Sequence, residues 1–138
     1  MTIAEMGGTS RQAIAAARAA LDNSLKGKSD GDIAKFASEL FTVLSALDSS
    51  APLRRSLTDV ARDTKDKEKL VSDLFARSAA NVVPLLSALV NLKWSKPSDL
   101  ADAIEQLAIE SEAAAANLSG ELLTRGRVVH VLQSRGWR

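Results

Sequence analysis

Apolar residues recur at three- and four-residue steps along most of this chain, and one segment has more of them than a surface helix needs. Between Asn81 and Trp94, steps of about 100° per residue sort the apolar side chains into two neighbouring stripes. The first stripe consists of Val82, Val83, Leu86, Leu89 and Val90. The second stripe consists of Leu85, Ala88 and Leu92. One stripe is enough to pack a helix into a bundle, so the second must be covered by another helix of the chain or by a partner.

The rest of the pattern predicts five more helices, separated by short polar or glycine-containing breaks. The first extends from about Ser10 to Leu25, and a linker over residues 27–31 separates it from the second. The sixth follows Pro97 and ends before a break at 117–120. The expected N-terminal capping residues are Ser10, Asp30, Ser50, Asp63 or Thr64, and, for the fifth helix, Asn81.

The buried face of each helix follows from the same periodicity. The second helix has the clearest stripe, formed by Ile33, Phe36, Ala37, Leu40, Leu44 and Leu47. The sixth is expected to bury Leu100, Ile104, Leu107 and Ala108, and the fourth Leu70, Val71, Leu74 and Phe75. Trp94 should close one end of the core, where its indole N–H needs a partner. The sequence therefore predicts an all-α six-helix bundle, with one domain at 1–117 and a tail at 118–138 that is either disordered or extended.

Composition favours the same fold class. Of 138 residues 46% are apolar, but there are only three Phe, two Trp and no Tyr, so the core must consist of Leu, Val, Ile and Ala. Three prolines and seven glycines are too few for the many turns of an all-β fold. The length is sufficient for one domain with a substantial core.

The residue types argue against catalysis and against membrane insertion. The chain has no cysteine and a single histidine, His130, so a nucleophile would have few possible bases. The segment Gly7-Gly8-Thr9-Ser10 lacks the lysine of a phosphate-binding loop. No apolar run approaches the ~20 residues of a membrane span, and the first residues are too polar for a signal peptide. We therefore expect a soluble, cytoplasmic protein with no catalytic residue, cofactor or metal.

Several charged groups are expected to form solvated surface. The acidic group consists of Asp99, Asp102, Glu105, Glu110 and Glu112, at a helix start or on polar faces. The run at 63–69 alternates in sign, as exposed helix starts do. Arg54 and Arg55, on the short third helix, should face solvent. Net charge is +1, and the most basic segment is the tail, with four arginines against one glutamate.

The second stripe of the fifth helix raises the hypothesis of a binding groove. Beside its main apolar face the first helix has a row of small residues, Ala13, Ala16 and Ala20. If the two helices are neighbours, this row and the stripe Leu85, Ala88 and Leu92 would form a groove for a partner's amphipathic helix. The alternative is that the bundle buries both rows internally. The pattern by itself leaves both possibilities open.

A set of short blocks, in order along the chain, carries a family resemblance. The longer ones are SRQAIAAAR at 10–18, LRRSLTD at 53–59, PLLSALV at 84–90 and DLADAIE at 99–105. The shorter ones are LD at 21–22, ELF at 39–41, LD at 47–48, KLV at 69–71, LF at 74–75 and WS at 94–95. Over residues 10 to about 112 this order and spacing resembles the N-terminal domain of the delta subunit of F-type ATP synthase, most closely its actinobacterial branch. The mitochondrial equivalent is the oligomycin-sensitivity-conferring protein.

The resemblance implies a six-helix bundle whose first and fifth helices receive the N-terminal helix of the alpha subunit. Carried over, the partner-binding positions are Ala13, Ala16, Ala20, Leu85, Ala88 and Leu92. It implies a non-catalytic stator component that links the catalytic head to the peripheral stalk during proton-driven ATP synthesis, at the inner face of the cell membrane. The family continues into a second domain, which contacts the b subunit in the full-length protein and is expected to be absent here. Residues 113–138 do not follow the family's pattern, so either the chain is a fragment or its end diverges.

Two other classes of protein compete with this interpretation. One is an all-helical RNA-binding module similar to transcription antitermination factors, which would use Arg11, Arg18, Arg54, Arg55 and the basic tail. The near-zero net charge and the scarcity of aromatic residues argue against it, so no nucleic acid partner is expected. The other is a structural bundle that self-associates through its fifth helix.

Overall fold

The computed structural model describes residues 7–119, which form a helical bundle with no strand in that range. The elements are α1 (Gly8–Leu25), α2 (Asp30–Asp48), α3 (Ala51–Thr58), α4 (Thr64–Phe75), the short 3₁₀ helix η2 (Ala80–Val82), α5 (Val83–Val90) and α6 (Pro97–Ser119). The prediction of an all-α six-helix bundle is confirmed. The tail after Ser119, with His130 and the four arginines, lies outside the described residues, so its structure and the domain boundary remain predictions.

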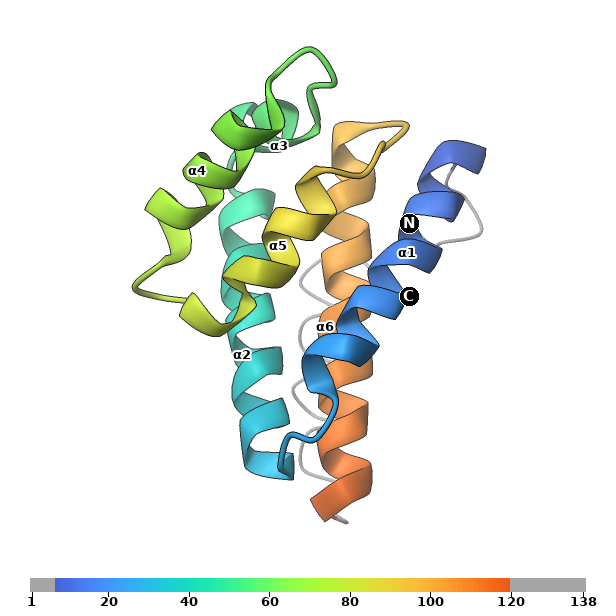
Figure 1. The fold of residues 1–138 in the computed structure, drawn as a ribbon, viewed down its shortest axis with the longest axis vertical. Helices are drawn as coiled ribbons and strands as arrows, with labels where there is room; N and C mark the ends of the chain where they lie inside the picture. Colours follow the sequence, from blue (N-terminus) through green and yellow to red (C-terminus); the bar gives the residue numbers. More distant parts are fainter. Residues whose placement is uncertain (1–6, 120–138) are drawn as a thin grey trace.

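The two longest helices form the centre of the bundle. In Figure 1, α2 and α6 run side by side in opposite directions. The other helices pack around this pair: α3 against α2 and α6, α4 against α5, and α1 against both α5 and α6. The arrangement brings the first and fifth helices into contact, as the groove hypothesis requires.

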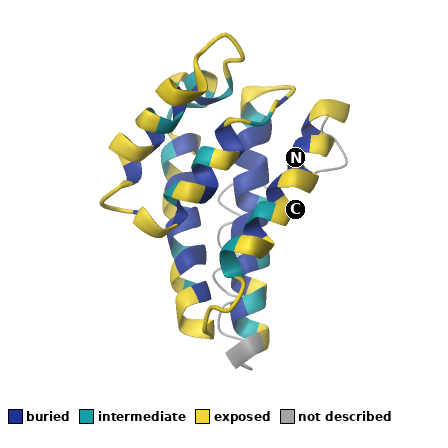
Figure 2. Cartoon of the chain, viewed as in Figure 1, coloured by how far each residue is buried: buried dark blue, intermediate teal, exposed yellow. Residues whose placement is uncertain are grey.

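The core follows the predicted stripes closely in the two central helices. All six α2 residues and all four α6 residues expected to be buried have at most 4% of their surface exposed. Alanines 17, 37, 103 and 108 are completely buried, so small side chains let the helices approach closely. Figure 2 shows the buried positions gathered on α2, α5 and α6, whereas α4 and the α3–α4 connection are largely exposed.

The end of the core near α5 is also as predicted. Trp94 is buried, and its indole N–H donates to the carbonyl oxygen of Leu89 at 2.9 Å. The first stripe of α5 is buried at Val82, Leu86, Leu89 and Val90 and half-buried at Val83. Pro84 lies in the first turn of α5, where its missing N–H costs little.

The predicted capping residues divide into two groups. Ser50 and Asp63 cap α3 and α4 as expected. The cap of α2 is Ser29 instead of Asp30, because the Ser29 hydroxyl accepts the Asp32 N–H, whereas Asp30 is the first helical residue.

Ser10 and Asn81 are not caps. Helix α1 begins two residues before Ser10, after Gly7, and the Ser10 hydroxyl is used in a contact with α6. Asn81 lies inside η2 and bonds to Glu39 of α2 through its backbone N–H at 2.8 Å and its side-chain amide at 2.7 Å. Both side chains are recruited by residues distant in sequence, which a local pattern does not reveal.

On α4, three expectations about exposure are wrong. Leu74, expected to be buried, is 47% exposed, and Leu70 is half-buried, because α4 needs only Val71 and Phe75 to pack against the bundle. Lys67, in the run expected to be solvated, is buried and donates to the carbonyl of Asp59 at 3.3 Å.

The acidic group of α6 is likewise not solvated surface. Asp99, Asp102, Glu105 and Glu112 are at most 9% exposed, and only Glu110 is half-buried. Asp99 accepts a hydrogen bond from Ser10, and the other three buried acids each have an interaction partner. A buried carboxylate is tolerated when it is paired in this way. Helix α6 also continues through the predicted break at Asn117 to Ser119.

Candidate partner-binding groove

A cleft of about 290 Å³ lies between α1 and the segment that follows α5. One wall comes from the first turns of α1, and the other from the turn where α5 ends. The lining residues are Thr9, Gln12, Ala13, Asn91, Leu92 and Lys93. The cleft therefore lies at the junction of the two helices from which the sequence predicted a groove.

The six predicted partner-binding residues occupy three kinds of environment. Ala13 and Leu92 line the cleft, with Ala13 only 5% exposed and Leu92 half-buried. Ala16 and Ala88 are exposed, Ala20 is half-buried, and Leu85 is 3% exposed as part of the core. The structure thus brings Ala13 and Leu92 together, leaves the two alanines accessible, and covers most of the surface of Leu85.

The end of α5 differs from its prediction, and the difference shapes the site. The helix was expected to continue to Trp94 but ends at Val90, where the backbone N–H of Asn91 bonds to the carbonyls of Ala88 and Leu89. Leu92 therefore enters the cleft from a turn and not from a helix face. The Trp94 bond to Leu89 holds this turn against the end of α5.

Sequence reasoning missed the polar rim of the cleft, which consists of Thr9, Gln12, Asn91 and Lys93. All four residues are exposed. Asn91 donates from its side-chain amide to Glu68 of α4 at 2.9 Å. A signal was present, because polar residues on both sides of Leu92 do not fit a continued apolar helix. The rim adds neutral hydrogen-bonding groups and one positive charge to an apolar floor.

A buried hydrogen-bond junction lies next to the cleft. The Ser10 hydroxyl donates to Asp99 Oδ2 at 2.8 Å and accepts the backbone N–H of Ser95 at 2.7 Å. Both Ser10 and Asp99 are completely buried. The junction ties the start of α1 to the α5–α6 connection and to the first turn of α6.

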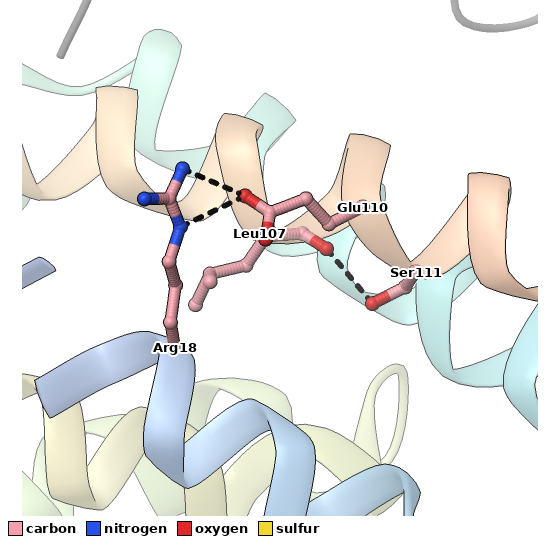
Figure 3. Close-up of polar contacts among 4 residues, drawn as sticks. All are labelled: Arg18, Leu107, Glu110 and Ser111. Carbon is pink, nitrogen blue, oxygen red and sulfur yellow. Dashed lines mark hydrogen bonds and ion pairs between the residues drawn. The ribbon is translucent and has the colours of Figure 1, made fainter. Parts of the chain in front are cut away.

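Two of the arginines that an RNA-binding module would need are already engaged. Arg18 forms an ion pair with Glu110 of α6, with 3.2 Å between Arg18 Nη2 and Glu110 Oε2 (Figure 3). Arg54, expected to face solvent, is half-buried and donates to the carbonyl of Leu47 at the end of α2. These contacts hold α1 to α6 and α3 to α2, so neither arginine forms part of an open basic patch.

Three further features of the described range bear on other kinds of site. No group of three or more metal-binding side chains occurs among residues 7–119. A second cavity, of about 10 Å³, is lined only by apolar core residues. No described helix is both long and apolar enough to cross a membrane.

The fold defines an all-helical bundle domain, and comparison with known proteins shows which proteins it resembles in sequence. No family model matches the sequence. The chain is 38% identical over 132 residues to ATP synthase subunit delta of Streptomyces griseus, an alignment that covers 90% of this chain and 48% of the relative. Subunit delta of Beutenbergia cavernae is 42% identical over 97 residues, with 70% of this chain and 35% of that protein covered. Subunit delta of Salinispora tropica is 33% identical over 115 residues, with 83% of this chain and 42% of that protein covered.

The chain is therefore related to the ATP synthase delta subunits of actinobacteria, which confirms the resemblance found in the sequence. It spans about half the length of the curated relatives it matches.

Proposed function

We propose that this chain is a non-catalytic stator component of an F-type ATP synthase, and that its α1–α5 groove binds the N-terminal helix of the alpha subunit. In this role it links the catalytic head to the peripheral stalk, so that the head resists the torque of the rotor. The complex would hold it at the inner, cytoplasmic face of the cell membrane. Contact with the b subunit is assigned to the full-length protein.

The observation that supports this proposal most is the position of the cleft. In a chain related to delta subunits, it lies between the first of the two helices that the resemblance names as the receiving surface and the turn that follows the second. Its apolar lining residues, Ala13 and Leu92, are among the residues named for binding. Ala16 and Ala88 provide accessible small side chains, on which a partner helix can approach closely.

The energetics of such docking are those of an amphipathic helix entering a groove. Each Å² of apolar surface removed from water contributes about 25 cal/mol, and ordering a flexible terminal helix costs about 2–5 kcal/mol. The partner must therefore contribute several large apolar side chains, since the groove itself offers mostly alanine. This requirement favours a helix with an apolar stripe over a mainly polar ligand.

The test is to measure the affinity of a synthetic peptide of the alpha subunit's N-terminal helix for three variants. Ala16→Glu and Ala88→Glu change exposed residues, so both proteins should fold like the wild type. A carboxylate placed against an apolar helix loses water without gaining a partner, so we expect each to weaken binding at least about tenfold. Ala15→Glu makes the same change at an exposed position about 100° further round α1, and should bind within about twofold of wild type.

Isothermal titration calorimetry gives the affinities, and thermal unfolding followed by circular dichroism checks the folded state. Equal affinity of all three folded variants, or no binding to the wild type, would refute alpha-subunit docking in this groove. Sedimentation of the free chain tests the competing self-association model, which requires that the fraction of dimer increases with protein concentration.

A further inference from the structure

We propose that Ser10 is a positioning residue that sets the separation of the two walls of the groove. The proposal rests on the proposed function for the identity of the ligand, but the geometry it concerns is a property of the free chain. Ser10 does not line the cleft. It acts through the residues on either side of it and through its buried contacts.

The first step is the connection between the walls. Ser10 lies directly beside Thr9 and two residues from Gln12, which line one wall. Ser95, whose N–H bonds to the Ser10 hydroxyl at 2.7 Å, lies two residues after Lys93 of the other wall. A single hydroxyl group therefore joins the two chain segments that face each other across the groove.

The Ser10 hydroxyl also supplies a hydrogen bond to the buried carboxylate of Asp99. The Ser10 hydroxyl donates to Asp99 Oδ2, and Oδ1 is buried with no hydrogen-bond partner among the described residues. If the hydroxyl were removed, a completely buried carboxylate would lose the donor to Oδ2. A buried charge without a partner is costly, so the structure should relax by admitting water to Asp99. We expect water to reach Asp99 through a movement of the start of α1 away from α6 and from the α5–α6 connection. This movement would widen the groove.

The third step is the close contact at Gly7, immediately before α1. A Cβ atom added at Gly7 would lie 2.7 Å from Ser95 Oγ, a contact that rotation of the serine side chain can relieve, and 3.2 Å from Ser95 Cβ, which is tighter than ordinary van der Waals contact. At the next residue, Gly8, an added Cβ would meet nothing within 4 Å. The start of α1 is thus held against Ser95 by a hydrogen bond and also packed directly on it. We expect the Gly7→Ala variant to press the start of α1 and Ser95 apart by a few tenths of an ångström, while the Ser10–Asp99 bond stays chemically intact.

The experiment combines hydrogen exchange of the free protein with binding of the alpha-subunit peptide. Ser10→Ala and Gly7→Ala should speed amide exchange at residues 91–95. Both should also weaken binding of the peptide about tenfold, because the two walls can no longer contact the peptide helix at the same time. Ser111→Ala is the control for Ser10→Ala, because it removes another completely buried hydroxyl, bonded within α6 to the Leu107 carbonyl at 2.8 Å (Figure 3). Gly8→Ala is the control for Gly7→Ala. Both controls should keep exchange at 91–95 and affinity within about twofold of wild type.

The outcomes separate this proposal from the proposed function. If folded Ser10→Ala matches Ser111→Ala in exchange at 91–95 and in affinity, the positioning role is refuted. If Ser10→Ala fails to fold, the comparison of Gly7→Ala with Gly8→Ala decides in the same way. If the wild type does not bind the peptide, the docking proposal fails, and exchange at 91–95 alone decides the role of Ser10.

Discussion

The contact between Glu39 and Asn81 gives the sharpest stability prediction, because it holds the start of α5 on the central helix α2. Glu39 is 8% exposed, and its two carboxylate oxygens accept the Asn81 backbone N–H at 2.8 Å and the side-chain amide at 2.7 Å. Replacing Glu39 with Ala removes both bonds. Replacing Asn81 with Ala removes only the side-chain bond, since the backbone N–H remains.

The magnitudes follow from these geometries. A hydrogen bond to a charged group contributes about 1.5–3 kcal/mol, and water can reach Asn81 because it is exposed, so the low end applies. We expect Glu39→Ala to lower the free energy of unfolding by about 3 kcal/mol and Asn81→Ala by about 1.5 kcal/mol. In the double variant the side-chain bond is lost only once. The coupling energy of the double-mutant cycle should therefore be about 1.5 kcal/mol.

Urea unfolding of the four proteins, followed by circular dichroism, measures the cycle. The control is the pair Glu68 and Asn91, which forms the same amide–carboxylate bond at 2.9 Å in an exposed setting. Its coupling should be below about 0.5 kcal/mol, because exposed pairs gain little over water. If the Glu39–Asn81 cycle were additive, Asn81 would act as a simple helix cap and the present account of this contact would be wrong.

Two further predictions concern α4 and the α1–α2 connection. Leu74→Ala should lower the free energy of unfolding by less than about 1 kcal/mol, because Leu74 is 47% exposed. Phe75→Ala, at 4% exposure, should lower it by about 3–5 kcal/mol. Equal losses in urea unfolding would contradict the orientation of α4. Gly27 has a φ of 77°, so Gly27→Ala should lower the free energy of unfolding by about 1–2 kcal/mol. Gly31→Ala is the control and should not destabilise the protein, because nothing lies within 4 Å of an added Cβ there. Melting temperatures compare the two variants, and a Gly27→Ala protein as stable as Gly31→Ala would rule out the left-handed turn.

The parts of the fold that the sequence predicts well are those controlled by one local rule. Helices α2 and α6 each bury a stripe that repeats every three to four residues, so periodicity alone names residues such as Leu40, Leu47 and Leu107 correctly. The caps Ser50 and Asp63 are equally local, because the side chain and the amide it satisfies lie within three residues.

Several of the errors share a physical cause, which is contact between residues distant in sequence. Ser10 and Asp99 are 89 residues apart, and Glu39 and Asn81 are 42 apart. No local pattern shows that a serine will satisfy a buried aspartate on another helix, so the acids of α6 look like solvated surface. Once these pairs form, Ser10 and Asn81 are no longer available as caps.

The candidate site shows the same division. The small residues of α1 and the second stripe of α5 follow from periodicity, and two of them, Ala13 and Leu92, do line the cleft. The burial of Leu85 and the polar rim do not follow from it, because both depend on where α5 ends and how its last turn is held. The bond from the Trp94 indole N–H to the Leu89 carbonyl, five residues earlier, helps to hold that turn.

The central claim is that the α1–α5 groove receives the N-terminal helix of the alpha subunit, and a titration of isotope-labelled protein with that peptide, followed by amide chemical shifts, tests it most directly. The account predicts saturable shifts concentrated at residues 9–20 and 85–93, with little change on α3 and α4. The claim would be contradicted by shifts centred on α3 or α4. It would also be contradicted by the absence of shifts at a peptide concentration of about 1 mM, which corresponds to the weakest dissociation constant of interest.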